Sequence, residues 1–304
     1  MQNKLNVVFT IDRNYIQHFC VTCTSLLENN PNLGRIFLVH DMECNTDIIK
    51  AINFLNQKYK CFIHQITLSD TIFDNFKISH HLTKATYFRL LLAEILPKDM
   101  DRVLFLDADI IVNGSLEEIV HSNFSKNRAI SHSGKQNLPA GDEYYLLAVD
   151  HKLGDNLHWM RKIGFKGLKY SNAGVMYINL QKWRSSNMSR TLIQNAIQYN
   201  EYIRWWDQDV LNITFDGEWG ELDFTFNAFG LLADEGKDHK IIHYIGSSKP
   251  WHFRNKHPYK QLYWQYLKMT PFKNYTPVDL TFFNILKSLL PASWKKKIKS
   301  ILQL

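Results

Sequence analysis

The stretch Val103-Leu-Phe-Leu-Asp107-Ala108-Asp109-Ile-Ile-Val112 decides the fold, because two carboxylates interrupt an otherwise apolar run that contains several β-branched residues. Such a run is typical of a strand that is buried on both faces of a parallel sheet. Ionised carboxylates are costly in a core unless a cation neutralises them. We therefore expect Asp107 and Asp109 to lie where the strand ends and to bind a divalent metal ion through oxygen ligands. The alternative is that both residues only cap a turn before residues 113–115.

The 304 residues, 45% of them hydrophobic and 13% aromatic, can bury a large core as one domain or as one domain with an appendage. No apolar run reaches the roughly 18 residues that a membrane-spanning helix needs. Residues 1–6 lead directly into a strand-like run and lack the apolar core of a signal peptide, so we expect a cytoplasmic protein.

The four cysteines, Cys20, Cys23, Cys44 and Cys61, agree with a reducing compartment. The Cys20–Cys23 spacing has no second CxxC and no His pair that would complete a zinc site. Its apolar neighbours predict a buried helix instead.

Positive charge is concentrated at one end of the chain. The net charge is +7, and residues 281–304 contain five lysines and no acid. The rest of the chain is therefore close to neutral, which disfavours a nucleic-acid-binding protein.

The same basic segment has a helical apolar pattern on either side of Pro291, formed by Phe283, Leu286, Leu290, Trp294, Ile298, Ile301 and Leu302. A basic amphipathic helix of this kind fits an anionic membrane surface, where each basic residue contributes about 1 kcal/mol. The alternative is a helix that packs on its own domain and leaves a solvated lysine face.

Strand and helix patterns alternate along the first 66 residues. Strands are predicted at 5–11, 35–40 and 61–66, with a helix through about residue 28 and another at 46–58. This β-α-β-α-β order predicts a parallel sheet with right-handed crossovers. No GxGxxG or GxxxxGK[ST] motif follows any strand, which argues against dinucleotide redox chemistry and P-loop phosphoryl transfer.

Further along, the patterns predict a helix at 83–96, the strand that bears the aspartates, a helix at 143–163, a strand at 174–180, helices at 181–199 and from 205, and a last strand at 240–245.

Polar residues gather where four of these elements begin or end: Thr10 to Tyr15, Asp107 with Asp109, Asp207 to Asp209, and His243 with Gly246 and Lys249. Each has a plain alternative, since Asp12 and Asp207 are able to cap helices, His243 to be a core histidine and Lys249 to be solvated. One shared site explains all four more simply, because open α/β sheets bind nucleotides beyond the carboxyl ends of their strands.

The chain resembles glycosyltransferase family 8, a family of retaining, metal-dependent enzymes that use nucleotide sugars and have a GT-A fold. Its bacterial lipopolysaccharide and lipooligosaccharide α-galactosyl- and α-glucosyltransferases are the more similar members, and glycogenin is more distant. The residues that carry the resemblance occur in the family's order between 9 and 251: Phe9 to Tyr15, Thr86 to Arg89, Leu104 to Asp109, Asn172 to Val175, Asn179 to Trp183, Asp207 to Asn212 and His243 to Trp251.

The resemblance implies an α/β GT-A domain over residues 1–265, with a Rossmann-like, mostly parallel mixed sheet flanked by helices. The basic amphipathic pattern described above predicts that residues 266–304 form a helical tail that attaches to the membrane. The resemblance also implies that Asp107, Asp109 and His243 ligate one metal ion that bridges the donor's phosphates. Two carboxylates and an imidazole suit Mn²⁺ better than Mg²⁺, which prefers oxygen ligands and water.

The same resemblance assigns the donor and reaction residues. Those implied to bind the nucleotide sugar are Thr10, Asp12, Asn14, Tyr15, Arg89, Asp107, Ala108, Asn172, Gly174, Gly246 and Lys249. Those implied to act in the reaction are Gln208, Asp207, Arg89 and Asn172. Gln208 is a poor nucleophile, which favours same-face substitution over a covalent intermediate. On the acceptor side, His81 falls where relatives have a histidine.

We therefore expect a hexosyltransferase that moves galactose or glucose from UDP-galactose or UDP-glucose to a lipopolysaccharide, lipooligosaccharide or other cell-surface glycan, at the inner face of the cytoplasmic membrane. One alternative acceptor is a protein or glycoprotein glycan. The alternative from another class is an inactive nucleotide-sugar-binding module, which the presence of Asp107, Asp109, Gln208, His243 and Lys249 disfavours.

Overall fold

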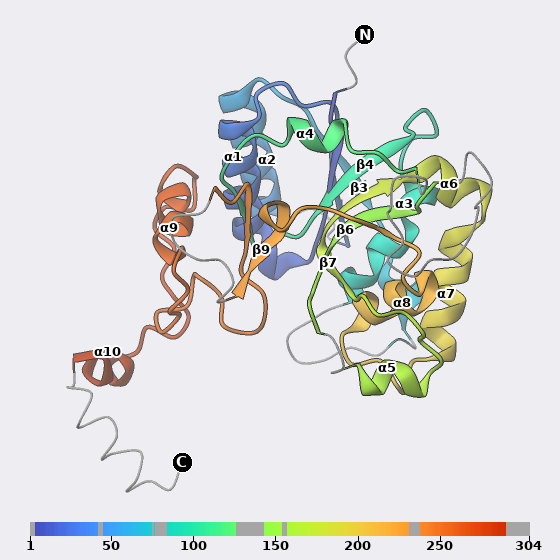
Figure 1. Cartoon of the computed structure of the whole chain (residues 1–304). Coiled ribbons are helices and arrows are strands. Elements are labelled where there is room, and N and C mark those ends of the chain that lie inside the picture. Colours follow the sequence, from blue (N-terminus) through green and yellow to red (C-terminus); the bar gives the residue numbers. More distant parts are fainter. Residues whose placement is uncertain are drawn as a thin grey trace, which may run out of the picture.

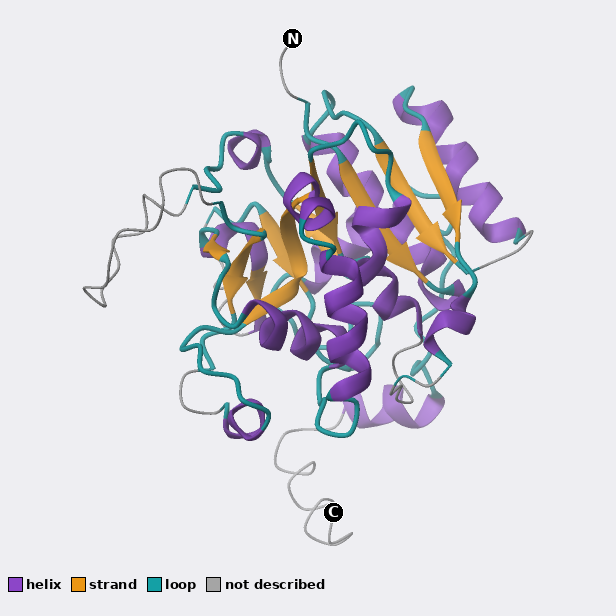
Figure 2. Cartoon of the chain, turned by 90° about the vertical axis from the view of Figure 1, so that its right-hand side faces the viewer, coloured by secondary structure: helices purple, strands orange, loops and turns teal. Residues whose placement is uncertain are grey.

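The computed structural model describes residues 4–41, 45–74, 76, 84–125, 143–153, 157–230 and 238–289. Within them the chain forms one large sheet between helices, with a smaller sheet beside it (Figures 1 and 2).

The large sheet has seven strands in the order β3-β2-β1-β4-β7-β6-β8. Their bounds are β1 Val7–Ile11, β2 Ile36–His40, β3 Ile63–Thr67, β4 Arg102–Leu106, β6 Leu146–Asp150, β7 Ser171–Asn179 and β8 Gly220–Glu221. β7 runs antiparallel to both β4 and β6, and the other neighbours are parallel. The expected mixed, mostly parallel sheet is confirmed.

Helices cover both faces of this sheet, which explains why its central strands β1, β2 and β4 are largely apolar and buried. On one face lie α1 Ile16–Asn29 and α2 Thr46–Tyr59. On the other lie η3 Lys84–Leu91, α3 Leu92–Ile95, α6 Leu180–Ser185, α7 Met188–Gln198 and α8 Trp206–Phe215. In β4, Leu104 packs into the first core and Val103 and Phe105 into the second.

The run from Val103 to Val112 forms two strands where one was expected, and the aspartates lie beyond the end of the first, as expected. β4 ends at Leu106, and β5 Ile110–Val112 pairs antiparallel with β10 Ile241–His243 in a second sheet completed by β9 Ala228–Phe229. The chain changes partner at the aspartates, because the Asp107 N–H donates to the Gly174 carbonyl at 2.8 Å and the Asp109 carbonyl accepts from Tyr244 N–H at 3.0 Å. The pair therefore lies where the two sheets meet.

Residues 143–163 do not form the expected single helix. They contain β6 and then the short helix α5 His158–Lys162. Alternate residues of β6 point into the two cores, Leu147 into one and Ala148 into the other. A short apolar run buried on both sides has no periodicity that separates strand from helix.

Two other expected helices are divided. Residues 84–91 form the 3-10 helix η3 before α3 begins, and α6 and α7 are separated near Asn187, whose φ is +51°. The remaining elements are η1 Arg13–Tyr15, η2 Asp70–Phe73, α4 Glu117–Val120, η5 Phe224–Asn227, α9 Lys260–Lys268 and α10 Phe282–Leu289.

The C-terminal part includes α9 and α10. The boundary predicted after residue 265 falls inside α9, whose Tyr263 and Leu267 pack in a buried cluster with Val21 of α1 and Ile242 of β10. α10 stands away from the sheet (Figure 1), and no described helix is long and apolar enough to cross a membrane. The predicted helical pattern beyond residue 289 lies outside the described residues.

The cysteine helix is confirmed as a buried one. Cys20 and Cys23 lie in α1 and are fully buried. Burial raises the pKa of the Cys20 thiol to about 12, which keeps it protonated and unreactive at neutral pH.

Candidate active site

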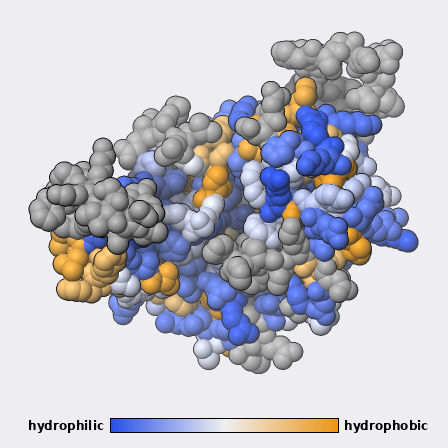
Figure 3. All heavy atoms as spheres, turned by 90° about the horizontal axis from the view of Figure 1, so that it is seen from below, coloured by the Kyte–Doolittle hydropathy of each residue, from blue (hydrophilic) through white to orange (hydrophobic). Residues whose placement is uncertain are grey.

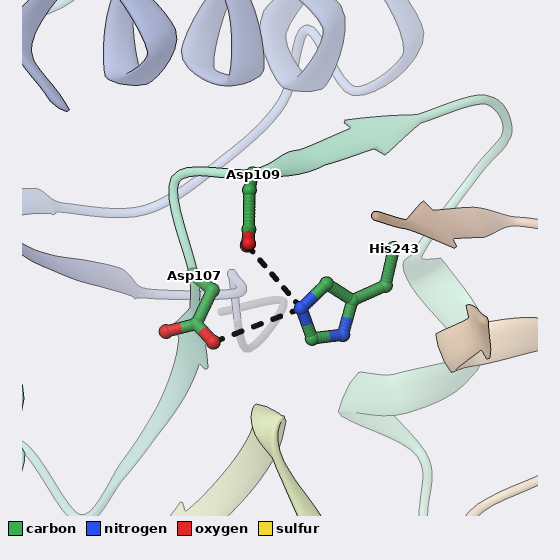
Figure 4. Close-up of side chains that lie close together, drawn as sticks. All are labelled: Asp107, Asp109 and His243. Carbon is green, nitrogen blue, oxygen red and sulfur yellow. Dashed lines mark ion pairs between the residues drawn. The ribbon is translucent and has the colours of Figure 1, made fainter. Parts of the chain in front are cut away.

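Three potential metal ligands converge where the two sheets meet. Asp107 and Asp109 lie between β4 and β5, and His243 ends β10 opposite Ile110. His243 Nε2 lies 3.2 Å from Asp109 Oδ1 and 3.8 Å from Asp107 Oδ2 (Figure 4). The three ligand atoms lie within 4.8 Å of one another. Asp109 Oδ1 is buried and has no hydrogen-bond donor among the described residues, as expected of an atom whose partner is a cation.

Gly174 of β7 makes room for this cluster. A Cβ atom added there would lie 2.1 Å from His243 Cε1 and 2.9 Å from Asp107 Oδ2. Only glycine lets β7 pass so close to both ligands. The residue expected to bind the donor thus has a second role in forming the cluster.

Lys249 adds a positive charge next to the aspartates. Its ammonium contacts Asp109 Oδ2 and donates to the Tyr244 carbonyl at 2.8 Å. Burial alone would raise the pKa of Asp109, but the Lys249 ammonium, with a smaller contribution from the His243 imidazole, reverses this and holds the pKa well below its usual range. The loop to Lys249 turns at Gly246, whose φ of +79° favours glycine.

Arg89 joins the metal cluster to the start of α8. Its Nη2 lies 2.8 Å from Asp107 Oδ1 and its Nε 3.0 Å from Asp207 Oδ2. The Nη1 group donates to the Ala173 carbonyl at 2.9 Å, and the guanidinium lies over the Phe105 ring. Burial would lower the pKa of Arg89, but the two aspartates raise it above its usual value.

Asp207 is a buried carboxylate at the beginning of α8. Its Oδ1 accepts a hydrogen bond from the Thr86 hydroxyl at 2.5 Å. Burial raises the pKa of Asp207 from 3.8 to about 6, although Arg89 opposes the shift. A carboxylate held in this way can stabilise a cationic sugar when it is ionised.

Gln208 is turned toward β7. Its Oε1 accepts from Ala173 N–H at 3.0 Å, and its Nε2 lies 3.4 Å from the Tyr170 hydroxyl. Tyr170 in turn donates to Asp209, which also accepts from the Arg204 N–H at 2.7 Å. These bonds fix the turn that brings Asp207 and Gln208 beside Arg89.

A model of the family described as Glycosyl transferase family 8 matches residues 6–255. The chain belongs to glycosyl transferase family 8. This glycosyltransferase is 25% identical over 311 residues to the lipopolysaccharide 1,2-glucosyltransferase of Escherichia coli K12, covering 98% of this chain and 85% of the relative. It is 28% identical over 288 residues to the lipopolysaccharide 1,3-galactosyltransferase of Salmonella typhimurium LT2, covering 90% and 80%.

A solved structure of the galactosyltransferase LgtC with donor and acceptor sugar analogues has a TM-score of 0.74 and 23% identity to the glycosyltransferase. The match covers 96% of this chain and all of that one. At this identity the likeness shows the fold, and it confirms the expected GT-A architecture.

The structure also places the N-terminal residues expected around the nucleotide. Asp12 caps η1 by accepting a hydrogen bond from Asn14 N–H at 2.8 Å. The capping role considered for Asp12 in the sequence is therefore observed. Thr10 is buried, one residue before the end of β1, while Asn14 is exposed. Tyr15 packs edge-on against Trp251, with ring centroids 5.8 Å apart. Burial, followed by the charges of Asp109 and two further aspartates, raises the pKa of Tyr15 well above its usual value.

The remaining expected residues divide into those that join the site and one that cannot be placed. Ala108 lies between the two aspartates, with its carbonyl accepting from the Thr22 hydroxyl at 2.9 Å. Asn172 lies on β7, two residues before Gly174. His81 lies outside the described residues.

Sequence patterns missed several residues that touch the site. Asn227 contacts His243, Thr86 contacts Asp207, and Tyr170 contacts Gln208. Thr86 belongs to the Thr86–Arg89 segment that carries the family resemblance, so its position near Arg89 could have identified it as a site residue. Nothing local marks Asn227, because its partners are 16 and 55 residues away in the chain.

The ionisation of Asp207 gives a pH prediction. Because its pKa is higher in the folded state, the stability that its protonated form contributes is complete below about pH 4 and is lost as the pH rises through about 6. Asp207→Asn cannot lose a proton there. In urea unfolding of metal-free protein, the free energy of unfolding of the wild type should therefore fall, relative to that of the variant, as the pH rises over this interval. A difference that does not change with pH would contradict the assignment.

Proposed function

We propose that the protein is a retaining, metal-dependent hexosyltransferase that moves galactose or glucose from a UDP-sugar to a lipopolysaccharide, lipooligosaccharide or other cell-surface glycan. The observation that carries this proposal is the convergence of Asp107, Asp109 and His243 beside Lys249. A metal-binding group next to a half-buried ammonium is what the diphosphate of a nucleotide sugar requires.

Two carboxylate oxygens and one imidazole nitrogen fit Mn²⁺, with Mg²⁺ as the second choice. When bound, the ion would offset the charge that develops on the leaving diphosphate. Lys249 supplies a second positive charge, and donor binding would draw its ammonium from Asp109 to a phosphate oxygen. Tyr15, Asp12 and Asn14, at the end of β1, would enclose the uridine.

On the sugar side, Arg89 pairs with Asp207, and the Arg89 and Gln208 side chains both hydrogen-bond the Ala173 backbone. Gln208 is an amide and therefore a poor nucleophile, so its carbonyl oxygen stabilises positive charge on the sugar without a covalent intermediate. Asp207, once ionised, adds to this stabilisation, while Arg89 pairs with both Asp107 and Asp207. We propose same-face substitution in which the donor's phosphate accepts the proton of the acceptor hydroxyl, which retains the α configuration.

The names of the two relatives support both donors. One is a lipopolysaccharide 1,2-glucosyltransferase and the other a lipopolysaccharide 1,3-galactosyltransferase. The two sugars differ in the orientation of one hydroxyl group. Both donors, and both glycolipid and protein-linked acceptors, therefore belong in the test.

The test measures UDP release from UDP-galactose and UDP-glucose by the full chain with a panel of oligosaccharide acceptors. Turnover should appear with Mn²⁺, stop with EDTA and return when Mn²⁺ is restored in excess. Binding of UDP without metal-dependent turnover of either donor would refute the enzyme proposal and leave a nucleotide-sugar-binding module.

We also propose that the C-terminal segment attaches the enzyme to an anionic membrane surface at the inner face of the cytoplasmic membrane. Support comes from α10, whose apolar side chains are solvent-exposed: Phe282 77%, Phe283 65%, Leu286 46% and Leu289 75%. They form an apolar surface at this end of the molecule (Figure 3). Five lysines in residues 281–304 complement anionic lipid, and the alternative of a helix packed on its own domain leaves these exposed side chains unexplained.

Replacing Phe282, Phe283, Leu286 and Leu289 together by serine should abolish most binding to anionic vesicles. The physical reason is that each buried apolar side chain contributes roughly 1.5–3 kcal/mol to partition into the bilayer interface. Vesicle sedimentation measures the bound fraction, and Leu168→Ser, which changes an exposed leucine outside α10, is the matched control. Unchanged vesicle binding of the fourfold variant would rule out attachment through α10. The same variant should still release UDP in solution, because α10 lies outside the proposed active site.

A further inference from the structure

A chain of buried amides leads from β7 to the metal cluster. Gly174 N–H donates to Asn172 Oδ1 at 3.0 Å, and Asn227 Nδ2 donates to the same oxygen at 2.8 Å. The other end of the Asn227 amide, Oδ1, lies 2.9 Å from His243 Nδ1. Asn227 has no exposed surface and ends η5, directly before β9, the neighbour of β10.

The donor and the acceptor of each hydrogen bond in this series follow from the first bond, between Gly174 N–H and Asn172. A peptide N–H can only donate, so the side-chain atom of Asn172 that faces Gly174 must be the oxygen. The Asn227 atom that faces this oxygen must then be the amide nitrogen. The opposite end of Asn227 is therefore an acceptor, and a neutral His243 must carry its proton on Nδ1.

We propose that Asn227 is a positioning residue that fixes the tautomer of His243. With the proton on Nδ1, the Nε2 lone pair faces the carboxylate oxygens of Asp107 and Asp109, and all three groups are acceptors that need a cation between them. The opposite tautomer would place an N–H on Nε2, 3.2 Å from Asp109 Oδ1, where a metal ligand needs a lone pair. This inference rests on the metal dependence proposed above.

This series of hydrogen bonds from Gly174 through Asn172 and Asn227 to His243, called the relay below, also sets the orientation of Asn172. Asn172 is expected to act on the donor sugar. Its oxygen is held by two donors, so Nδ2 is the group that remains for a ligand, and it can only donate. Asn227 thus joins the metal ligand to the sugar-binding amide by hydrogen bonds at both of its ends. Partners outside the metal coordination sphere that orient a histidine ligand in this way typically change metal affinity when they are replaced.

The first experiment needs neither metal nor substrate. In metal-free full-length protein labelled with ¹⁵N-histidine, long-range ¹H–¹⁵N correlation spectra assigned with His243→Gln should show His243 protonated on Nδ1 and unprotonated on Nε2. Asn227→Leu should lose this preference. Protonation of Nε2 in the wild-type protein would overturn the proposal, whatever the activity of the enzyme.

The second experiment measures Mn²⁺ affinity by titration calorimetry. Asn227→Leu should bind Mn²⁺ about 10- to 100-fold more weakly than the wild type. Asn227→Asp keeps an acceptor toward His243 Nδ1, so it should bind Mn²⁺ at least as tightly as the wild type while losing the bond to Asn172. Asn30→Ala removes a buried asparagine that ties α1 to Gly114 and Leu116, and it should leave Mn²⁺ affinity unchanged.

These measurements separate the relay from the function on which it rests. If the wild type binds no Mn²⁺, the metal dependence fails while the spectra still decide the tautomer. If the wild type binds Mn²⁺ and a folded Asn227→Leu binds equally well, the relay is wrong. Should Asn227→Leu not fold, weak Mn²⁺ binding by Asn227→Asp would overturn the relay by itself.

Discussion

Replacing Asp109 by alanine should lower kcat/KM for sugar transfer by about 10³-fold or more. The variant loses one of three ligands of the proposed metal, and stabilisation of the leaving diphosphate by a bound ion amounts to several kcal/mol, each 1.4 kcal/mol being about tenfold in rate. It also frees Lys249, whose ammonium contacts Asp109 Oδ2. Initial rates of UDP release, measured over a Mn²⁺ titration, should show that both the rate and the metal affinity fall.

The matched control for this variant is Asp99→Ala. Asp99 is exposed and pairs with Arg35 at the surface, where solvent screens the ion pair. Its removal should leave kcat/KM within the error of the wild type. Asp109→Ala with undiminished Mn²⁺-dependent turnover would show that the aspartate pair has no part in metal binding.

Much of the site was predictable because burying charge is costly. Asp107 and Asp109 interrupt an apolar run, so their need for a cation could be inferred from the sequence alone. His243, Lys249 and Gln208 look ordinary in isolation, and family resemblance was needed to bring them to the same place. The structure unites them for a simple reason, since β5 pairs with β10 and sets Ile110 opposite His243.

Where the sequence failed, long-range pairing decided the outcome. The apolar run from Val103 to Val112 predicts one strand in the sequence. In the structure its two halves belong to different sheets, because β4 pairs with β7 and β5 pairs with β10. Leu146 to Val149 is equally apolar, and only its place between β7 and β8 makes it a strand. No periodicity within either segment contains information on such partners.

Arg89 shows how an expected role can be incomplete. The resemblance implied contact with the donor, and the structure adds a bridge between Asp107 and Asp207, with Arg89 itself only 6% exposed. The guanidinium is planar and presents several donors, so it can hold both carboxylates and the Ala173 carbonyl at once. The metal cluster and the reaction residues therefore share one counter-ion.

Replacing Arg89 by methionine should lower the free energy of unfolding by about 3–5 kcal/mol, because it leaves buried carboxylates without a positive partner. Urea unfolding of metal-free protein near pH 7.5 measures the loss. Arg89→Lys should recover only part of it, because one ammonium cannot make the separate bonds of the guanidinium. Loss of Arg89 also removes the charge that opposes burial at Asp207, so the pKa of that carboxyl should rise further above 6.

The decisive comparison is the double variant Arg89→Met with Asp207→Asn. If the cost of Arg89→Met arises from an unpaired buried charge, removing the Asp207 charge as well should make the double variant more stable than Arg89→Met alone. Simple loss of packing around Phe105 would instead make the two destabilising effects add. Additive losses would therefore refute the shared counter-ion, whereas partial recovery would show that Arg89 compensates the buried negative charge of Asp207.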